Sequence, residues 1–527
     1  MVYLFEDSPI NGNNFAIDII LLIFVVVSAI KKLAGQTAIY GIPGILGRIL
    51  GYLLVPLYTR VFDPDLYGTV SVFYSYAAFL MVIMTYGMET AYFRFHQQEN
   101  DKEKVFSTAM ISILLTTSVF LLLVSLYSQR IAEWIDYPDN RSYVIWFGWI
   151  LALDALVAIP FGSLRAGNRP IKFASIKMTG ILLNIVLNLF FIVLCPYLLN
   201  HSENHLITGA VNSFYKTEWG IEYIFISNLI SSAVVLALLL PEFLKVRWKI
   251  DPALWRKMLL YAFPLLFAGM AGIVNETFDR LLLRYLLPSD ISEYQVGIYS
   301  ACYKISILMT IFIQAYRYAA EPFFFAQARE KNAKDVYAHI MDYFIIVVSL
   351  IFLGTMVYLD DFLLRFISAK YWQGRGVIPV LMLANLFLGV YYNLSIWYKL
   401  TGKTIWGAWF SAIGAVVTLI LNFWWIPLPV DHALHGYYGS AWATFICYAF
   451  MMILSYIIGQ KFYPVKYNLV KFFGYLGLSL LLYFVSMIIK IDHRVLSIAF
   501  HTILIGVYGV VVILVEKPAF IWKYIRF

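Results

Sequence analysis

Long apolar runs follow one another along this chain and are separated by short polar segments. Each run stays apolar over about twenty residues, enough for a helix to cross a bilayer, and none alternates as a membrane β-strand does. Because a bilayer admits only helices or closed barrels, the pattern predicts an all-α membrane protein. The roughly fourteen predicted spans lie near residues 34–58, 66–92, 104–127, 143–164, 173–198, 221–243, 257–284, 295–321, 337–358, 377–398, 405–427, 437–459, 468–489 and 495–515.

One further apolar segment precedes these spans. Residues 15–30 are apolar but short, and they contain Asp18. Their leader carries Glu6 and Asp7 rather than the positive charge of a signal peptide. Residues 1–30 are therefore either an accessory span or an extension outside the working fold, and the sequence leaves both alternatives open.

Lysine and arginine are unevenly shared between the loops. If the first span starts in the cytosol, the cytosolic segments hold about 24 of them and the opposite loops about 10. Basic residues favour the cytosolic side of a membrane. We therefore expect a multi-pass protein of the bacterial inner membrane whose C-terminus is cytosolic.

Composition agrees with a membrane protein and excludes several other classes. Hydrophobic residues make up 61% of the chain and charged residues 13%, too few to cover a soluble surface. The net charge of +8 is spread over many short loops, which argues against nucleic-acid binding. The three cysteines are scattered without metal-ligand spacing, so we expect buried packing thiols, no metal and no cofactor.

The two halves of the chain resemble each other in the same order. Glycine, glutamate, asparagine and arginine recur at the ends of corresponding spans, about 215–235 residues apart, which is typical of parallel-repeat transporters. The repeat predicts two pseudo-symmetric six-helix lobes, 31–244 and 245–461, followed by two further helices and a cytosolic tail in 462–527. The matched points are Arg60 with Arg284, DPDLYG with Gln295-Val-Gly, Glu89 with Glu321, Leu164-Arg-Ala-Gly with Lys399-Leu-Thr-Gly, Glu133-Trp-Ile with Arg365-Phe-Ile, and Leu187-Asn with Leu421-Asn.

Several of these segments resemble a known family. The text KKLAGQTAIYGIPGILGRILGYLLVPLYTRVFDPDLYGTVSVF, the LRAGN and LTGKT loops, and GYYGSAWAT resemble polysaccharide-repeat flippases. These belong to the multidrug/oligosaccharidyl-lipid/polysaccharide exporter superfamily. The resemblance, which covers residue 31 to the end, implies a V-shaped, MATE-like fold. It also implies a flippase that moves an undecaprenyl-diphosphate-linked oligosaccharide across the inner membrane, for surface polysaccharides such as O-antigen, lipopolysaccharide or capsule.

The same resemblance extends to lipid II flippases, which share a G/S-R-x-L-G pattern in span one. Here the pattern is Gly47-Arg48-Ile49-Leu50-Gly51. Those relatives usually carry another arginine six residues further on, where this chain has Leu54. The departure argues against lipid II as the cargo.

Charges inside the predicted spans are the candidate substrate-binding residues, because each is costly in hydrocarbon. A flippase needs a cationic, solvated path for a diphosphate, and guanidinium binds phosphate bidentately. The candidates are Arg48, Arg280, Lys304 and Lys177. Structural alternatives remain: an acid of another helix for Arg48, a pair with Glu276 for Arg280, and snorkelling of Lys177. Gly44, Gly47 and Gly51 are expected to form a closely packed face beside Arg48.

Further charges are candidate gating or coupling residues: Glu89, Asp154, Glu276, Asp279, Arg317 and Glu321. Glu89 and Glu321 match in the repeat and are expected at the cytosolic mouth, with a pair to Arg94 as the alternative for Glu89. Asp154 is either a protonatable coupling site or hydrogen-bonded to a neighbouring helix. Arg317 and Glu321 have the i,i+4 spacing of a local pair.

Two other functions are alternatives to the flippase. A membrane polymerase or ligase should carry a large loop with clustered acids or histidines, and residues 200–219 have no such spacing. A cation-coupled multidrug exporter should carry an acid in span one, where this chain has Arg48. We therefore predict a transporter rather than an enzyme. Its partners would be a lipid-linked oligosaccharide, membrane lipids and a polysaccharide polymerase, and coupling to a proton or sodium gradient is left open.

Overall fold

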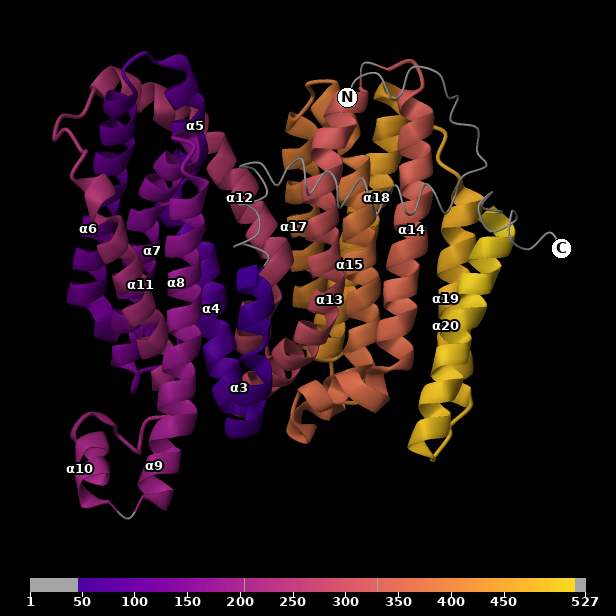
Figure 1. The fold of residues 1–527 in the computed structure, drawn as a ribbon, viewed down its shortest axis with the longest axis horizontal. Helices are drawn as coiled ribbons and strands as arrows, with labels where there is room; N and C mark the ends of the chain where they lie inside the picture. Colours follow the sequence, from indigo (N-terminus) through magenta and orange to yellow (C-terminus); the bar gives the residue numbers. More distant parts are fainter. Residues whose placement is uncertain (1–45, 203, 329, 517–527) are drawn as a thin grey trace.

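The computed structural model describes residues 46–202, 204–328 and 330–516, and within these ranges the chain is helical and forms no strand (Figure 1). Thirteen helices there are long and apolar enough to cross a membrane. The first predicted span, 34–58, lies partly outside the described residues. Residues 1–30 and the last residues of the tail lie wholly outside them. The all-α fold class is thus confirmed, and the two alternatives for residues 1–30 stay predictions.

The first lobe, called the N-lobe, lies on the left of Figure 1 in indigo and magenta. An α-helical stretch covers residues 46–52 and is interrupted at Leu53 and Leu54. The lobe continues with α3 (Val55–Val61), α4 (Pro64–Thr85), α5 (Met88–Gln98), α6 (Lys102–Trp134), α7 (Arg141–Ala166), α8 (Pro170–Leu189), the π-helix η1 (Phe190–Leu194), α9 (Cys195–His201), α10 (His205–Phe214) and α11 (Glu222–Phe243).

The second lobe, called the C-lobe, begins with a helix that crosses from one lobe to the other in Figure 1. Its elements are α12 (Pro252–Leu286), α13 (Ser289–Gln327), α14 (Ala333–Val357), η2 (Leu359–Leu363), η3 (Leu364–Phe366), η4 (Ala369–Gly376), α15 (Val377–Leu394), α16 (Ile396–Leu400), α17 (Ile405–Trp425) and α18 (Tyr437–Phe462). Two last helices, α19 (Leu469–Ile488) and α20 (Arg494–Glu516), pack against α14 at the edge of this lobe.

Local sequence signals set where several helices begin. Asp101 and Asp251 cap α6 and α12, because each carboxylate accepts a hydrogen bond from a backbone N–H in the first turn, at 3.0 and 2.9 Å. The Lys104 ammonium beside Asp251 also lowers the pKa of that carboxyl. Residues 200–219, which the sequence places in a loop between two spans, contain α10, whose Leu206 is 82% exposed.

The internal repeat is visible in matching contacts. Asn188 and Asn422 are both fully buried, and each donates to a carbonyl four residues earlier, at 2.8 and 2.7 Å. Each also accepts one hydroxyl, from Tyr58 and Ser440 respectively. A buried side-chain amide needs hydrogen-bond partners, and the two halves supply the same kinds of partner at the matched position. The cysteines Cys195, Cys302 and Cys447 are buried and free, as predicted.

The lobes meet at one end of the molecule, called here the joined end, where α4 crosses α13. Gly68 and Gly297 are the crossing point, because a Cβ on either would lie about 2 Å from a carbonyl oxygen of the other helix. The two glycines come from the matched segments DPDLYG and Gln295-Val-Gly. The closest approach of the lobes therefore rests on a pair of repeat-related glycines.

The matched arginines reinforce the joined end in the same way. Arg60 of the N-lobe donates to the carbonyl of Arg365 in the C-lobe at 3.0 Å. Arg284 of the C-lobe donates to the carbonyl of Asp136 in the N-lobe at 3.2 Å. A further ion pair joins Asp63 to Lys370 across the lobes at 2.6 Å. The lower part of Figure 1 shows the ribbons of the two lobes converging here.

Candidate functional site

Three of the predicted cations come from separate helices and gather at the lobe boundary. Arg48 lies on the stretch 46–52 of the N-lobe and is exposed, whereas Arg280 on α12 and Lys304 on α13 belong to the C-lobe. Both arginines are close enough to Lys304 to interact with it electrostatically. The group is called the cationic trio below. Its positive charges are brought together although they repel each other, which favours a place where an anion binds.

Arg280 is the buried member of the trio. It forms an ion pair with Asp279 at 3.0 Å, and its guanidinium stacks 4.5 Å from the ring centre of Tyr303. Asp279 also accepts the Tyr299 hydroxyl at 2.6 Å. The predicted ion pair between Arg280 and Glu276 is wrong. Arg280 donates to the Glu276 backbone carbonyl at 3.1 Å, and the Glu276 side chain is exposed.

Arg48 and Lys304 differ from Arg280 in their surroundings. Among the residues that the structure describes, no ion pair joins either of them to a carboxylate. Lys304 is half-buried, and Arg48 also interacts electrostatically with Tyr392. A cation in a membrane span without a carboxylate partner is costly, so these two charges are available to an anionic ligand.

The repeat-related acids Glu89 and Glu321 sit at the end of the lobes opposite the joined end. Glu89 pairs with Arg165 of α7, so the expected partner Arg94, which stacks on Tyr261 at 4.2 Å, is wrong. In the C-lobe, Glu321 pairs with Lys399. In both lobes the acid of the second span thus holds a cation at the end of the fourth span.

The local pair predicted on α13 is also present. Arg317 lies 3.8 Å from Glu321, and its guanidinium stacks 3.9 Å from the ring centre of Tyr392. Glu321 is therefore shared between Arg317 and Lys399. Sequence reasoning missed Arg165, Lys399 and Tyr392, and only the matched LRAG and LTG loops carried a signal for the first two.

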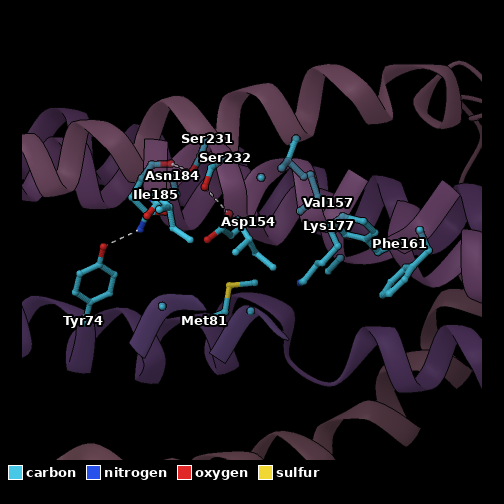
Figure 2. Close-up of a pocket in the computed structure, with 18 of the residues that line it drawn as sticks. Tyr74, Met81, Asp154, Val157, Phe161, Lys177, Asn184, Ile185, Ser231 and Ser232 are labelled. Atoms are coloured by element: carbon cyan, nitrogen blue, oxygen red, sulfur yellow. Dashed lines mark hydrogen bonds between the residues drawn. The ribbon is translucent and has the colours of Figure 1, made fainter. Parts of the chain in front are cut away.

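A cavity of about 680 Å³ lies inside the N-lobe, among α4, α5, α7, α8, α11 and the stretch 46–52, and Glu89 is among its lining residues (Figure 2). Asp154 accepts a hydrogen bond from Ser232 of α11 at 2.8 Å, so the predicted contact to a neighbouring helix is confirmed. Lys177 lines the same cavity, with its ammonium 5.2 Å from the ring centre of Phe161. Lys177 is thus in this cavity rather than in the cationic trio, and it interacts electrostatically with Asp154.

The same cavity changes the expectation for the glycines of span one. Gly47 packs closely, since a Cβ there would lie 2.8 Å from the Ile181 side chain of α8. Gly51 has nothing within 4 Å, so close packing at this position is wrong. Gly44 lies outside the described residues. Within those residues, no group of three histidine, cysteine, aspartate or glutamate side chains could hold a metal ion.

A comparison with protein families assigns this chain to one of them. The family described as polysaccharide biosynthesis protein matches residues 33–327, more than half of the chain. The chain belongs to this family. The match confirms the resemblance noted from span one, the DPDLYG segment and the LRAGN loop. No curated protein matches this chain at a significant level.

Several solved structures share the fold of this chain at low sequence identity. The lipid II flippase MurJ, in an inward closed conformation, has a TM-score of 0.66 at 15% identity, covering 90% of this chain and 98% of MurJ. An inward-facing multidrug resistance MATE family transporter gives 0.55 at 13% identity, covering 79% and 94%. A variant of the Vibrio cholerae MATE transporter VcmN gives 0.55 at 14% identity, covering 83% and 98%. The two-lobed, MATE-like architecture is therefore confirmed.

Proposed function

We propose that this protein is a flippase that carries a polyprenyl-diphosphate-linked oligosaccharide across the inner membrane for polysaccharide biosynthesis. The cationic trio is the observation that carries the proposal. It is contributed by both lobes, and two of its members, Arg48 and Lys304, have no carboxylate partner among the described residues. A diphosphate would neutralise the trio and bridge the lobes. The family supports polysaccharide biosynthesis as the context.

The chemistry of the trio suits a diphosphate in particular. Arg48 offers a planar guanidinium that can bind two phosphate oxygens, and Lys304 offers a compact ammonium. Arg280 is held in place by Asp279 and Tyr303, so its charge is already oriented before a ligand arrives. Asp279 and, more weakly, Glu276 interact electrostatically with Arg280, which lowers the net charge of the trio and would help the anion to be released on the far side.

Alternating access follows from the two ends of the molecule. We assign the joined end to the periplasm, because the loops at this end carry fewer lysines and arginines than those at the opposite end. The structure would then be a cytosol-facing state whose periplasmic side is closed by the Gly68–Gly297 crossing. Separation of α4 from α13 at this crossing, together with closure of the opposite end near Glu89 and Glu321, would expose the trio to the periplasm. The C-terminus is cytosolic in this assignment.

We propose no catalytic residue, since the task is movement rather than bond chemistry. Asp154 is our candidate for coupling to a proton or sodium gradient, because it is an acid deep in α7 beside a cavity. A multidrug exporter is the second candidate, supported by the same acid and by the MATE fold. The trio favours an anionic cargo and therefore the flippase.

Genetic complementation tests the proposal. Arg48→Ala and Lys304→Ala would each be expressed in a strain that lacks the native gene, and surface polysaccharide would be quantified. We expect both variants to lose most of the polysaccharide while remaining in the membrane at normal levels. Lys490→Ala is the matched control, because Lys490 is an exposed cation in the loop between α19 and α20. Normal polysaccharide in both test variants would remove the assignment of the trio.

A further inference from the structure

The two lobes differ at one pair of matched positions. Arg60 and Arg284 correspond in the repeat, and nine residues before each stand Gly51 and Asn275. Asn275 is 7% exposed, and its amide donates to the carbonyl of Ser411 at 3.1 Å. Gly51 instead leaves open space, since a Cβ there would have nothing within 4 Å. Asn275 therefore occupies space inside the C-lobe, whereas the matched Gly51 leaves the corresponding space in the N-lobe open as part of the cavity.

The facing helices differ in the same sense. Asn188 and Asn422 correspond, and four residues before them stand Asn184 on α8 and Thr418 on α17. Thr418 donates its hydroxyl to Asn275 at 3.2 Å, so the C-lobe satisfies its polar groups internally. Asn184 accepts one bond from Asn188, and within the described residues its amide donates to no partner. The Asn184 amide of the N-lobe thus remains available as a donor, whereas the matched Thr418 hydroxyl of the C-lobe already donates to Asn275.

The lining of the N-lobe cavity suits a polyhydroxylated ligand. Figure 2 shows Tyr74 on α4 facing the side chains of α7, α8 and α11 across the space. The carbonyl oxygen of the Asn228 side chain has no donor among the described residues, and its amide donates to Tyr74 at 3.1 Å. Asp154 and Lys177 add an acceptor and a donor. Sugar hydroxyls both donate and accept, so they match such a mixture, whereas a lipid tail would leave it unsatisfied.

The size and position of the cavity point the same way. Its volume of about 680 Å³ falls within the roughly 300–1,000 Å³ of sites for drug-sized ligands, far more than one ion needs. Gly47 and Gly51 line it from the stretch 46–52. Arg48, on the same helical turn, interacts with Lys304 of the C-lobe. A single short helix therefore contributes to both the trio and the cavity.

We propose that the N-lobe cavity is the subsite for the glycan of the cargo, next to the cationic trio that holds the diphosphate. The inference rests on the proposed function and deepens it, because it assigns recognition of the sugar to one lobe. Gly51 creates the space, and Asn184, Asn228, Asp154 and Lys177 supply the polar contacts. At the matched position of the C-lobe the Asn275 side chain is bonded to Ser411 and Thr418, so we assign the sugar to the N-lobe alone.

Binding measurements on the full chain in lipid nanodiscs test this inference. The two test lipids are undecaprenyl diphosphate without sugar and the lipid-linked repeat unit extracted from the strain that carries the gene. The variants are Gly51→Leu, which fills the cavity, and Asn184→Leu, which removes polar contacts at similar size. Gly506→Leu is the matched control, because Gly506 on α20 also has nothing within 4 Å and lies outside the N-lobe.

We expect the wild type to bind the glycosylated lipid at least about tenfold more tightly than the bare lipid. Gly51→Leu and Asn184→Leu should remove this difference and leave the affinity for the bare lipid within about twofold. Gly506→Leu should behave as the wild type. The readout thus separates recognition of the sugar from recognition of the diphosphate.

Two results would overturn the glycan subsite. One is an unchanged preference for the glycosylated lipid in both variants, and the other is an equal loss of affinity for both lipids. A wild-type protein that binds neither lipid would instead contradict the proposed function itself. Because the two variants change volume and polarity separately, misfolding of one leaves the other to decide.

Discussion

In the C-lobe the Asn275 side chain ties α12 to α17, whereas in the N-lobe the matched Gly51 borders a cavity of about 680 Å³. Elsewhere the lobes agree closely: Asn188 and Asn422 are buried in the same way, and repeat-related arginines reach across the joined end. The two halves of the repeat thus share the contacts that join the lobes to each other. They differ at the position where we propose that one lobe holds the cargo.

The largest effect is expected where the lobes are most alike. Gly297→Leu and Gly68→Leu each place a side chain against a backbone carbonyl that lies about 2 Å from an ideal Cβ, and overpacking of this kind costs about 1–3 kcal/mol or more. The joined end should therefore open, and transport should fail. Crosslinking between Asp63→Cys and Lys370→Cys, which replace an inter-lobe ion pair, measures the closed population.

Both glycines should behave alike, because each meets the other helix at the same crossing. Gly354→Leu serves as the control, since a Cβ at Gly354 has nothing within 4 Å. Full crosslinking in either glycine variant would show that the crossing is looser than the structure indicates. A large difference between the two variants would break the symmetry of the joined end.

A smaller effect is expected where the lobes differ. Asn275→Gly gives the C-lobe the residue of the N-lobe. It removes the hydrogen bonds to Ser411 and Thr418, together with a weaker one from the Cys447 thiol, and adds a glycine inside α12. About 2–3 kcal/mol of stability should be lost, at about 1 kcal/mol for each bond and for the glycine. Chemical unfolding in detergent measures this loss. The reverse change, Gly51→Asn, should cost less than about 1 kcal/mol because its side chain enters open space.

Equal destabilisation by the two exchanges would contradict the comparison. It would mean that Gly51 is as tightly packed as Asn275, and hence that the N-lobe has no functional space. Stabilisation by Gly51→Asn together with loss of transport would sharpen the comparison instead. That outcome is typical of a site where stability is sacrificed for binding.

The smallest effects are expected at the repeat-related ion pairs. Glu89→Gln and Glu321→Gln each weaken pairs whose side chains are 24–40% exposed, and such pairs are worth about 1 kcal/mol or less. Glu321→Gln should cost slightly more, because Glu321 serves both Arg317 and Lys399. Double-mutant cycles with Arg165→Gln and Lys399→Gln measure the coupling. A coupling well above this range at one end only would identify that pair as a true gate.

Local patterns in the sequence predicted much of the fold. Continuous apolar runs predicted the membrane helices, and the repeat predicted two lobes because its matches fall at helix ends. The Arg317–Glu321 pair was also predictable, since i,i+4 spacing alone brings the two side chains together. The lobe boundaries at 244/245 and 461/462 stay predictions.

Contacts between distant segments were harder to predict. Glu89 finds Arg165, which lies 76 residues away, in preference to the nearby Arg94. Arg280 takes its neighbour Asp279, because Tyr299 on α13 holds that carboxylate in the protein interior. The N-lobe cavity is lined from α4, α5, α7, α8, α11 and the stretch 46–52, so no single stretch of sequence shows it. Extending the repeat from Arg60 back to Gly51 would have provided a signal.

The most direct test of the central claim is flipping in proteoliposomes. A short-chain fluorescent polyprenyl diphosphate that carries one sugar would be followed between leaflets, with Arg48→Gln and Lys304→Gln beside the wild type. We predict that each variant flips it about tenfold more slowly or worse, since each loses a charge-assisted phosphate contact of about 1.5–3 kcal/mol. Wild-type rates in both variants, or equal wild-type rates for a neutral lipid with the same sugar, would contradict the claim that the cationic trio carries a diphosphate.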